Sequence, residues 1–419
     1  MKIGYACLAL AVPGSGMRSC TLKNADAERL LSLIGHNLDS LERLIDYNIR
    51  NGIQLFRISS DLIPFGSSLA AELPWREIFS ERLSVIGGKI LHSGMRVSMH
   101  PGQYTVLNSS NFAVVGRAIE DLRYHAGVLD GLGLGKTHKI ILHLGGVYGD
   151  KKQAERRFLS RYQGLDPAIR TRLVLENDDK MFHIGDVLDT ASHAGIPVVY
   201  DNLHNAVNSA DSSRIDLDWI TRCSETWKRD DGPQKIHYSQ QHPDKRAGAH
   251  SESIRIDPFL AFSRPLSGMN VDIMLEVKDK NLSALKCINC VSDSGIGALE
   301  AEWARYKYCV LEHSPELYQA IHQLLRENRA DPALELYRMI EAAFALPVAI
   351  ENGVNAARHV WGYLIEKTSK AEKQRFETLL QRFGSGETGL QTVKHDLLRL
   401  SLQYQEDNLL NGYYLYKES

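Results

Sequence analysis

The sequence has 419 residues, of which 43% are apolar and 24% charged, and its formal net charge is −2. This is the composition of a globular protein long enough to form one large core and a second, smaller one. It excludes a protein that holds nucleic acid through a global basic field, although a local basic groove can hide in a neutral total.

The N-terminal apolar run, YACLALAV at residues 5–12, follows a single lysine, Lys2. It is too short to span a bilayer, and a first strand explains it better than a secretory signal does. Because no other segment is long and apolar enough for a span, we expect no membrane partner.

Six cysteines are scattered along the chain, and Cys287 and Cys290 have C-x-x-C spacing. No second pair completes a zinc ribbon, so we interpret this spacing as incidental. Reduced thiols are the default for such a chain, and we expect a monomer in the cytoplasm.

Segments typical of strands and of helices alternate from the N-terminus to about residue 290. Strands are predicted over residues 3–10, 54–59, 95–99, 139–143, 172–176, 198–201, 235–238 and 271–276. Helices are predicted from a cap at Asn24 or Asp26 to residue 51, over 75–93, 111–132, 150–162, 183–194, 215–228 and 257–263, and from residue 281 onward. Eight such β-then-α units predict a (β/α)8 TIM barrel over residues 1–310. A doubly wound α/β sheet is the alternative, but it would spread the polar side chains at its strand ends along an open edge.

From residue 311 to 419 the strand signals almost disappear. Amphipathic helices are predicted over residues 313–328, 331–346, 356–384 and 392–405. We therefore expect an all-helical C-terminal extension, in which no motif indicates a role.

Side chains that bind metals stand at or just beyond the ends of the predicted strands. They are His100, His143, Glu176, Asp201, His204, His237 and Glu276, and His250 joins them from the loop GAHSES. A parallel barrel presents the C-terminal ends of its strands at one face, so these eight side chains are predicted to converge. Imidazoles with carboxylates suit Zn²⁺ or Mn²⁺, and a glutamate can bridge two such ions. Other histidines, including His125 and His138, are expected to be hydrogen-bonded structural residues or to lie on the surface.

Lys235 and His237 are two positions apart in one predicted strand, so both side chains are predicted to point into the barrel. A cluster of cations would repel a charged lysine there. Lys235 is therefore expected to be neutral or carboxylated, and the alternative is that one of the two residues faces outward.

Seven segments together resemble the UV damage endonuclease family over residues 1–310: SSDLIPFGS, SMHPGQY, HLGG, LEND, DNLHN, KIHYS and MLEVKDKN. The resemblance implies a TIM barrel related in architecture to endonuclease IV. It implies cutting of DNA directly 5′ to UV photoproducts, which leaves a 3′-hydroxyl and a 5′-phosphate. It also implies up to three divalent ions, usually Mn²⁺ with Zn²⁺ or Mg²⁺ as alternatives, held by the eight side chains above. Lys235 matches a family lysine that can be carboxylated.

Two positions depart from the related patterns. Endonuclease IV has an aspartate two residues before the histidine that corresponds to His250, where this sequence has Gly248. A carboxylated Lys235 would restore that anion. Family members commonly carry a histidine after the PFxS loop, where this sequence has Ser68. One metal is therefore expected to bind more weakly or to take a water, unless Asp61 or Glu72 fills the place.

Gln103 and Tyr104 follow His100 and match a pair that probes the duplex at the lesion in the family. An aromatic ring can fill the gap left by unstacked bases, and an amide can meet unpaired base edges. A simple tight turn after Pro101 is the alternative. Tyr5 resembles a family tyrosine near the damaged bases, with ordinary packing in the barrel core as its alternative.

The sequence thus predicts a metal-dependent endodeoxyribonuclease that acts on UV-damaged double-stranded DNA. Glu176 and Glu276 would hold the metal cluster, and Lys235 would tune it or act as a base. A metal-dependent sugar isomerase on the same barrel is a second hypothesis, although it would not need the HPGQY segment. A DNA damage-binding protein that lost turnover with the ligand at Ser68 is a third.

Overall fold

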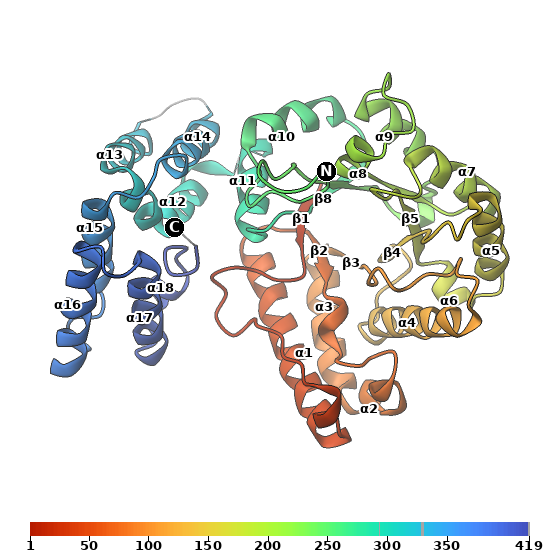
Figure 1. Ribbon diagram of the computed structural model, residues 1–419, viewed down its shortest axis with the longest axis horizontal. Helices are drawn as coiled ribbons and strands as arrows, with labels where there is room; N and C mark the ends of the chain where they lie inside the picture. Colours follow the sequence, from red (N-terminus) through yellow and green to blue (C-terminus); the bar gives the residue numbers. More distant parts are fainter. Residues whose placement is uncertain (293, 328–330, 418–419) are drawn as a thin grey trace. The chain divides into compact units, whose positions relative to one another are not determined.

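The structure is a computed structural model that describes residues 1–292, 294–327 and 331–417. Its N-terminal part is a closed barrel of parallel strands whose spatial order follows the sequence (Figure 1). The strands are β1 (Ile3–Ala6), β2 (Leu55–Ile58), β3 (Arg96–Met99), β4 (Lys139–His143), β5 (Leu173–Glu176), β6 (Val198–Asp201), β7 (Gln234–Tyr238) and β8 (Val271–Leu275). β1 pairs with both β2 and β8, which closes the ring. The predicted TIM-barrel fold is confirmed.

Helices follow the strands and surround the barrel. Those up to residue 292 are α1 (Ala27–Arg50), α2 (Trp75–Ile78), α3 (Ser80–His92), α4 (Phe112–Gly131), α5 (Lys151–Gln163), α6 (Pro167–Arg170), α7 (Ile184–Ala194), α8 (Asn202–Val207), α9 (Asp216–Ser224), α10 (Ile256–Ser263) and α11 (Asn281–Val291). Short 3-10 turns are η1 (Leu22–Asn24), η2 (Ser60–Leu62), η3 (Leu69–Glu72), η4 (Arg229–Asp231) and η5 (Arg264–Leu266).

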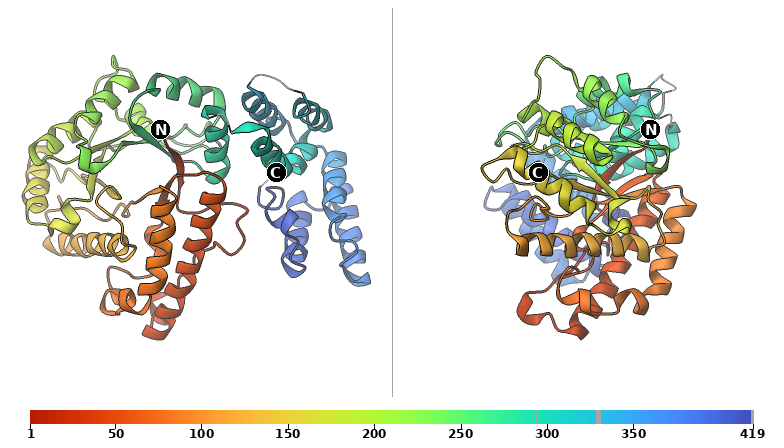
Figure 2. Two further views of the ribbon diagram at one scale, coloured as in Figure 1. Left: turned by 180° about the vertical axis from the view of Figure 1, so that it is seen from behind. Right: turned by 90° about the vertical axis from the view of Figure 1, so that its right-hand side faces the viewer.

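The helix α1 illustrates how the sequence sets these elements. Asp26 caps it by accepting a hydrogen bond from the backbone N–H of Arg29. Its leucines and isoleucines at helical spacing are buried, and α1 lies beside α3 in both views of the barrel (Figures 1 and 2).

Two predicted elements differ from the structure. The helix predicted over residues 75–93 is in fact two helices, because Phe79 leaves helical geometry at φ −104° and ψ 18°. The first strand ends at Ala6 instead of residue 10, because Cys7 has a φ of 70° and takes the chain out of the sheet.

The barrel interior holds charged side chains near the N-terminal ends of the strands. Arg96 of β3 forms a buried ion pair with Asp272 of β8 at 3.1 Å. Lys235, the second residue of β7, lies opposite Asp272 in the strand register and is fully buried. The polar residues at the other ends of the strands are therefore a separate group.

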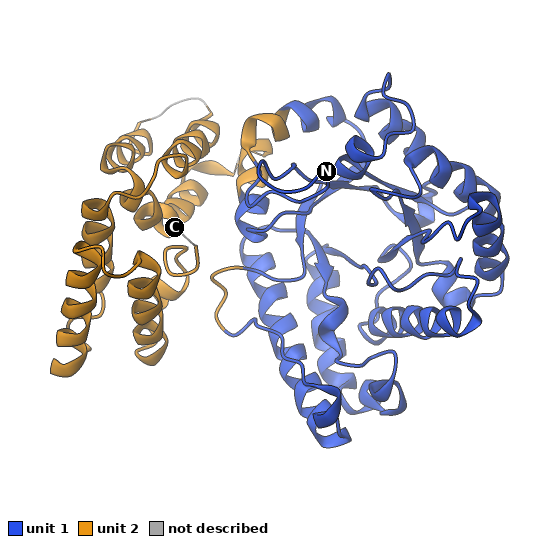
Figure 3. Cartoon of the chain, viewed as in Figure 1, with its two compact units in different colours: residues 1–9, 14–254, 261–285 blue, residues 10–13, 255–260, 286–419 orange. Residues whose placement is uncertain are grey.

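The chain divides into two compact units, of which the second comprises Leu10–Pro13, Arg255–Leu260 and Lys286–Ser419 (Figure 3). Its further helices are α12 (Gly295–His313), α13 (Pro315–Leu324), α14 (Pro332–Phe344), α15 (Ile350–Trp361), α16 (Lys370–Gly384), α17 (Leu390–Gln403) and α18 (Asp407–Leu410). The boundary expected between the barrel and the helical extension, after residue 310, lies inside α12. Parts of the predicted helical extension, residues 328–330 and 418–419, lie outside the described residues.

The single helix predicted over residues 356–384 is two helices in the structure, α15 and α16. Ser369 and Glu372 form a capping box that begins α16, in which each side chain accepts a hydrogen bond from the other residue's backbone N–H. A capping box fixes where a helix starts. The amphipathic pattern of the sequence therefore runs on across residues 362–369, where the backbone leaves the helix.

Within the described residues, no helix combines the length and the hydropathy of a membrane span. All six cysteines are free thiols.

Candidate metal centre

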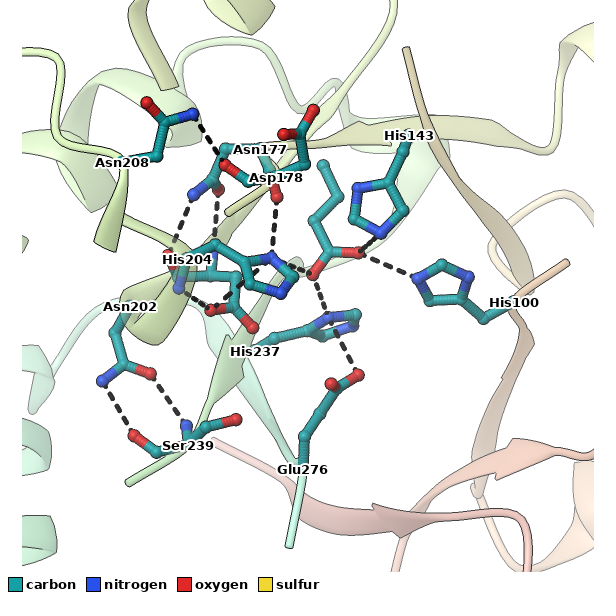
Figure 4. Close-up of polar contacts among 12 residues, drawn as sticks. His100, His143, Asn177, Asp178, Asn202, His204, Asn208, His237, Ser239 and Glu276 are labelled. Atoms are coloured by element: carbon teal, nitrogen blue, oxygen red, sulfur yellow. Dashed lines mark hydrogen bonds and ion pairs between the residues drawn. The ribbon is translucent and has the colours of Figure 1, made fainter. Parts of the chain in front are cut away.

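The eight predicted ligands lie at the C-terminal end of the barrel. His143, Glu176 and Asp201 are the last residues of β4, β5 and β6, and His237 lies in β7. His100 and Glu276 come directly after β3 and β8. His204 comes from the first turns of α8, and His250 lies in the loop after β7, where it forms an isolated bridge with Gln241. Figure 4 shows the side chains of His100, His143, His204, His237 and Glu276 turned toward one another.

Glu176 is the hub of the arrangement. Its Oε2 lies 2.9 Å from Nε2 of His100 and 3.5 Å from Nε2 of His143. Its Oε1 lies 2.7 Å from Nδ1 of His237 and 3.8 Å from Nδ1 of His204. One carboxylate therefore faces four imidazoles that come from four different elements.

Glu276 forms a second focus. Its Oε1 lies 3.4 Å from Nδ1 of His237, and its Oε2 lies 3.6 Å from Nε2 of His250. Arg57 of β2 forms an ion pair with the same carboxylate. The two glutamates thus both approach Nδ1 of His237.

Two histidines are oriented by backbone carbonyls. His204 Nδ1 lies 2.9 Å from the carbonyl oxygen of Asn177, and His100 Nδ1 lies 3.0 Å from that of Pro101. A ring N–H that donates to a carbonyl fixes the tautomer and leaves Nε2 as the atom with a lone pair. Both rings can therefore present Nε2 to a cation.

Asp201 and His204 form a linked pair at the start of α8. The Asp201 side chain accepts a hydrogen bond from the backbone N–H of His204 at 2.7 Å and caps the helix. Burial raises the pKa of Asp201 to about 6, against the opposing effect of His204. Burial would lower the pKa of His204, but the charges of Asp201 and Glu176 outweigh it and raise that pKa to about 9.

The pKa of Glu176 lies well below its ordinary value. Burial alone would raise it, but the positive potential of His237 and His143 outweighs burial. Burial also opposes ionisation of Glu276, and Arg57 and then His237 outweigh it, so the pKa of Glu276 is lowered too. Both carboxylates are therefore anionic at neutral pH and available as ligands.

The donor set fits divalent cations. The ligand atoms of His100, His143 and Glu176 lie within 4.8 Å of one another, and so do those of Glu176, Asp201 and His237. Asp201 Oδ2 and His237 Nε2 are buried and make no hydrogen bond among the described residues. Buried polar atoms are normally satisfied, and a metal ion with imidazole and carboxylate ligands would satisfy both.

Lys235 lies in the barrel and not on its outer face. The side chain is 0% exposed, and its Nζ has no hydrogen-bond partner among the described residues. Burial first, and then the charge of Arg96, lowers its pKa well below the ordinary value. Arg96 and Arg57 lie on β3 and β2, which are not neighbours of β7, so their charges act on Lys235 across the interior.

The loop after β3 carries the predicted lesion probe. Gln103 and Tyr104 are exposed, and 82% of Tyr104 is accessible to solvent. Thr105 donates a 2.5 Å hydrogen bond to Asp121 of α4, and Ser60 of η2 donates one of 2.7 Å to the carbonyl oxygen of His100. Both ends of the loop are therefore anchored while its tip is free to contact a ligand.

One predicted residue does not reach this surface. Tyr5 is fully buried, its hydroxyl donates to Asn48 of α1 at 2.8 Å, and its ring packs edge-on against Phe56. It lies between the barrel and a helix, which agrees with the packing alternative and not with contact to damaged bases. Ser68 is exposed and its Oγ lies 3.4 Å from the carbonyl oxygen of Phe65.

A family model described as UV-endonuclease UvdE matches residues 1–300. The chain belongs to this UV-endonuclease family. A protein named UV DNA damage endonuclease from Clostridium perfringens is 37% identical over 385 residues, which cover 91% of this chain and 92% of that protein. One of the same name from Bacillus cereus is 30% identical over 303 residues, 70% of this chain and 95% of that protein.

Among solved structures, the one called SacUVDE is 35% identical, covers 70% of this chain and 98% of its own, and has a TM-score of 0.66. A second family model, a protein of unknown function, matches residues 307–417. The family assignment therefore rests on the barrel, and the helical unit carries no assigned activity.

Two residues of this UV endonuclease barrel, Arg57 and Ser60, are missed by the sequence analysis. Arg57 binds Glu276, and His125 with Ser60 supports His100 from behind, since His125 Nε2 lies 3.0 Å from Ser60 Oγ. Arg57 occupies a strand position that carries no motif of its own. His125 follows the expectation of a hydrogen-bonded structural histidine, as does His138, whose Nδ1 accepts from the backbone N–H of Val97.

Proposed function

We propose that the chain is a DNA repair endonuclease that hydrolyses the phosphodiester bond immediately 5′ to UV photoproducts in duplex DNA. The reaction would leave a 3′-hydroxyl and a 5′-phosphate and would use up to three divalent cations, with Mn²⁺ foremost. The observation that carries this proposal is the convergence of eight imidazoles and carboxylates at one end of a UV-endonuclease barrel.

Two groups of side chains would hold the cations. His100, His143 and Glu176 form one, and Glu176, Asp201 and His237 form the other, so that Glu176 belongs to both. His204 would add to the second group, and His250 with Glu276 would complete the set. The chemistry that divalent cations supply at such a site is the activation of water and the neutralisation of charge on a phosphate.

The protein's own groups set the conditions for that chemistry. Arg57 holds Glu276 in place and anionic, and the carbonyls of Asn177 and Pro101 orient His204 and His100. Such outer contacts keep ligands in productive geometry. Lys235, buried below His237, would tune the charge of the centre in carboxylated form or act as a base if it is unmodified.

Lesion recognition would fall to Gln103 and Tyr104. A crosslinked dimer stacks poorly and is cheap to extrude, so a duplex at the lesion deforms more easily than an intact one. The exposed ring of Tyr104 can fill the gap that the bases leave, and Gln103 can meet unpaired base edges.

The test is incubation of the full chain with an end-labelled duplex that carries one UV photoproduct, in Mn²⁺ and in EDTA. We expect incision directly 5′ to the lesion in Mn²⁺ only. The nick should carry a 3′-hydroxyl and a 5′-phosphate, which are the ends that a ligase joins. The undamaged duplex is the control, and a panel of aldoses and ketoses is incubated alongside. Conversion of a sugar without incision would favour the isomerase hypothesis, and lesion binding without either reaction would favour the non-catalytic one.

A further inference from the structure

The helical unit contains a pocket of about 80 Å³ formed by α12, the turn after α15, α18 and the residues that follow α18. Its wall includes Lys307 and Tyr308 of α12, Tyr363 just after α15, and Tyr414 near the C-terminus. All of these residues belong to the same compact unit. The pocket is thus a feature of the part of the chain whose family has no assigned function.

Lys307 brings an unneutralised positive charge to this pocket. Its Nζ lies 4.8 Å from the centre of the Tyr308 ring and 5.9 Å from that of Tyr363, and it donates to the Tyr363 hydroxyl at 3.3 Å. Among the described residues, no carboxylate lies within ion-pair distance of Lys307.

The neighbouring charges cancel. Arg305 is paired with Glu302 at 2.7 Å, and Lys367 is paired with Glu406 at 2.5 Å. Lys307 therefore leaves the pocket with a net positive charge, which favours an anionic ligand.

The hydroxyl groups add donors that have no acceptor. Tyr308 and Tyr363 share one hydrogen bond, with their oxygens 3.1 Å apart, so one O–H of the pair is left over whichever of them donates. Tyr414 is 3% exposed, and its hydroxyl makes no hydrogen bond among the described residues. Of these three tyrosines only Tyr414 is buried, so its unpartnered hydroxyl is costly, and an acceptor bound in the pocket would satisfy it.

We propose that this pocket binds the phosphate group of a small molecule or of a nucleic-acid end. Lys307 donates the charged hydrogen bond, and the surplus hydroxyl protons of the Tyr308–Tyr363 pair and of Tyr414 donate the others. A phosphate suits the pocket because it accepts hydrogen bonds through several oxygens. Its negative charge would also balance the positive charge of Lys307. The proposal does not depend on the activity of the barrel.

The test uses the full chain with ¹³C-labelled tyrosine rings, freed of metal with EDTA so that the barrel holds no cation for phosphate. Inorganic phosphate is titrated at constant ionic strength with chloride as the balancing salt. We expect saturable shifts of the ring signals of Tyr308, Tyr363 and Tyr414, assigned by Tyr→Phe variants. The variant Lys307→Met should weaken binding by about tenfold or more, because a charged hydrogen bond is lost.

The matched control is Lys370→Met, which removes an exposed lysine of α16 outside the pocket. Tyr414→Phe is a second variant, and it removes only one hydroxyl. It should weaken the binding of phosphate while the circular dichroism spectrum stays unchanged. Shifts that fail to saturate, or that are equal in the parent and in Lys307→Met, would overturn the proposal.

Two oligonucleotides separate the sources of the phosphate. If a 5′-phosphorylated oligonucleotide moves the pocket's tyrosine signals at lower concentration than its 5′-hydroxyl counterpart, the ligand is a nucleic-acid end. If the two behave alike and inorganic phosphate still binds, the ligand is a free phosphate or a small phosphate ester.

Discussion

Nδ1 of His237 lies 2.7 Å from Oε1 of Glu176, and both side chains are fully enclosed by the barrel. An N–H donated to this carboxylate leaves Nε2 of the same ring free, and that atom has no other partner among the described residues. The pair therefore links the two ligand groups of the centre, because Glu176 belongs to both and His237 also faces Glu276.

Replacement of Gln103 and Tyr104 by alanine together should weaken the preference for damaged over undamaged duplex. Neither side chain contacts a ligand group, so the metal content should stay at the parent value. Competition binding with the two duplexes and metal analysis of the same samples measure both quantities. A double variant that keeps the parent's preference would leave only the tight-turn interpretation of this segment.

Thr105→Val should loosen the loop that carries this probe. The change keeps the shape of the side chain but removes its hydrogen bond to Asp121, an interaction with a charged group worth about 1.5–3 kcal/mol. We expect damage-specific incision to fall about tenfold, with metal content unchanged, and Thr105→Ser to restore it. Parent activity in the valine variant would show that the anchor at Asp121 does not position the probe.

The sequence analysis was most accurate where a polar residue ends an apolar run. The predicted strands over 139–143 and 198–201 agree with β4 and β6 residue for residue, and they place His143 and Asp201 correctly. It was wrong at Phe79 and over residues 362–369, where a local cap or bend interrupts a helix without breaking its amphipathic pattern.

The side of β1 on which Tyr5 lies was not predictable either. Strands of a parallel barrel are buried on both faces, so an apolar run does not show which residues point inward. The contacts of Arg57 with Glu276 and of Ser60 with His100 join strands and loops far apart in the chain. No local pattern encodes such pairs.

Ser68→His tests whether this position is a lost ligand. If it is, the variant should take up more metal than the parent after the same Mn²⁺ loading, and it should need less Mn²⁺ for half-maximal incision. Even outer contacts of a metal site change affinity or activity by about 10–100-fold. Ser68→Ala is the control for loss of the serine alone. Identical metal occupancy in the parent and in Ser68→His would mean that the loop of Phe65 is not part of the centre.

Lys235→Met should stabilise the metal-free protein at neutral pH. Burial lowers the pKa of Lys235 in the folded state, so the unfolded chain binds the extra proton and stability rises with pH until the unfolded pKa of about 10.4 is passed. A buried amine without a partner destabilises the folded protein by about 1–3 kcal/mol, and the variant removes this amine. Urea unfolding between about pH 7 and pH 10 should show a gain that shrinks as the pH rises.

A second measurement separates a neutral lysine from a modified one. Carboxylation in ¹³C-bicarbonate would give a carbamate carbon resonance that is absent from Lys235→Met. Destabilisation by the substitution at neutral pH, in protein that shows no such resonance, would contradict the account of an unpartnered neutral amine.

The most direct test of the metal centre is incision of a duplex with one UV photoproduct by Glu176→Gln in Mn²⁺. The substitution keeps the size of the side chain but removes the charge that both ligand groups share. We expect a folded protein with unchanged circular dichroism, reduced bound Mn²⁺ and no detectable incision, whereas Glu155→Gln on α5, away from the centre, should cut like the parent. Incision by Glu176→Gln at a rate near that of the parent would contradict the assignment of these residues as the catalytic metal centre.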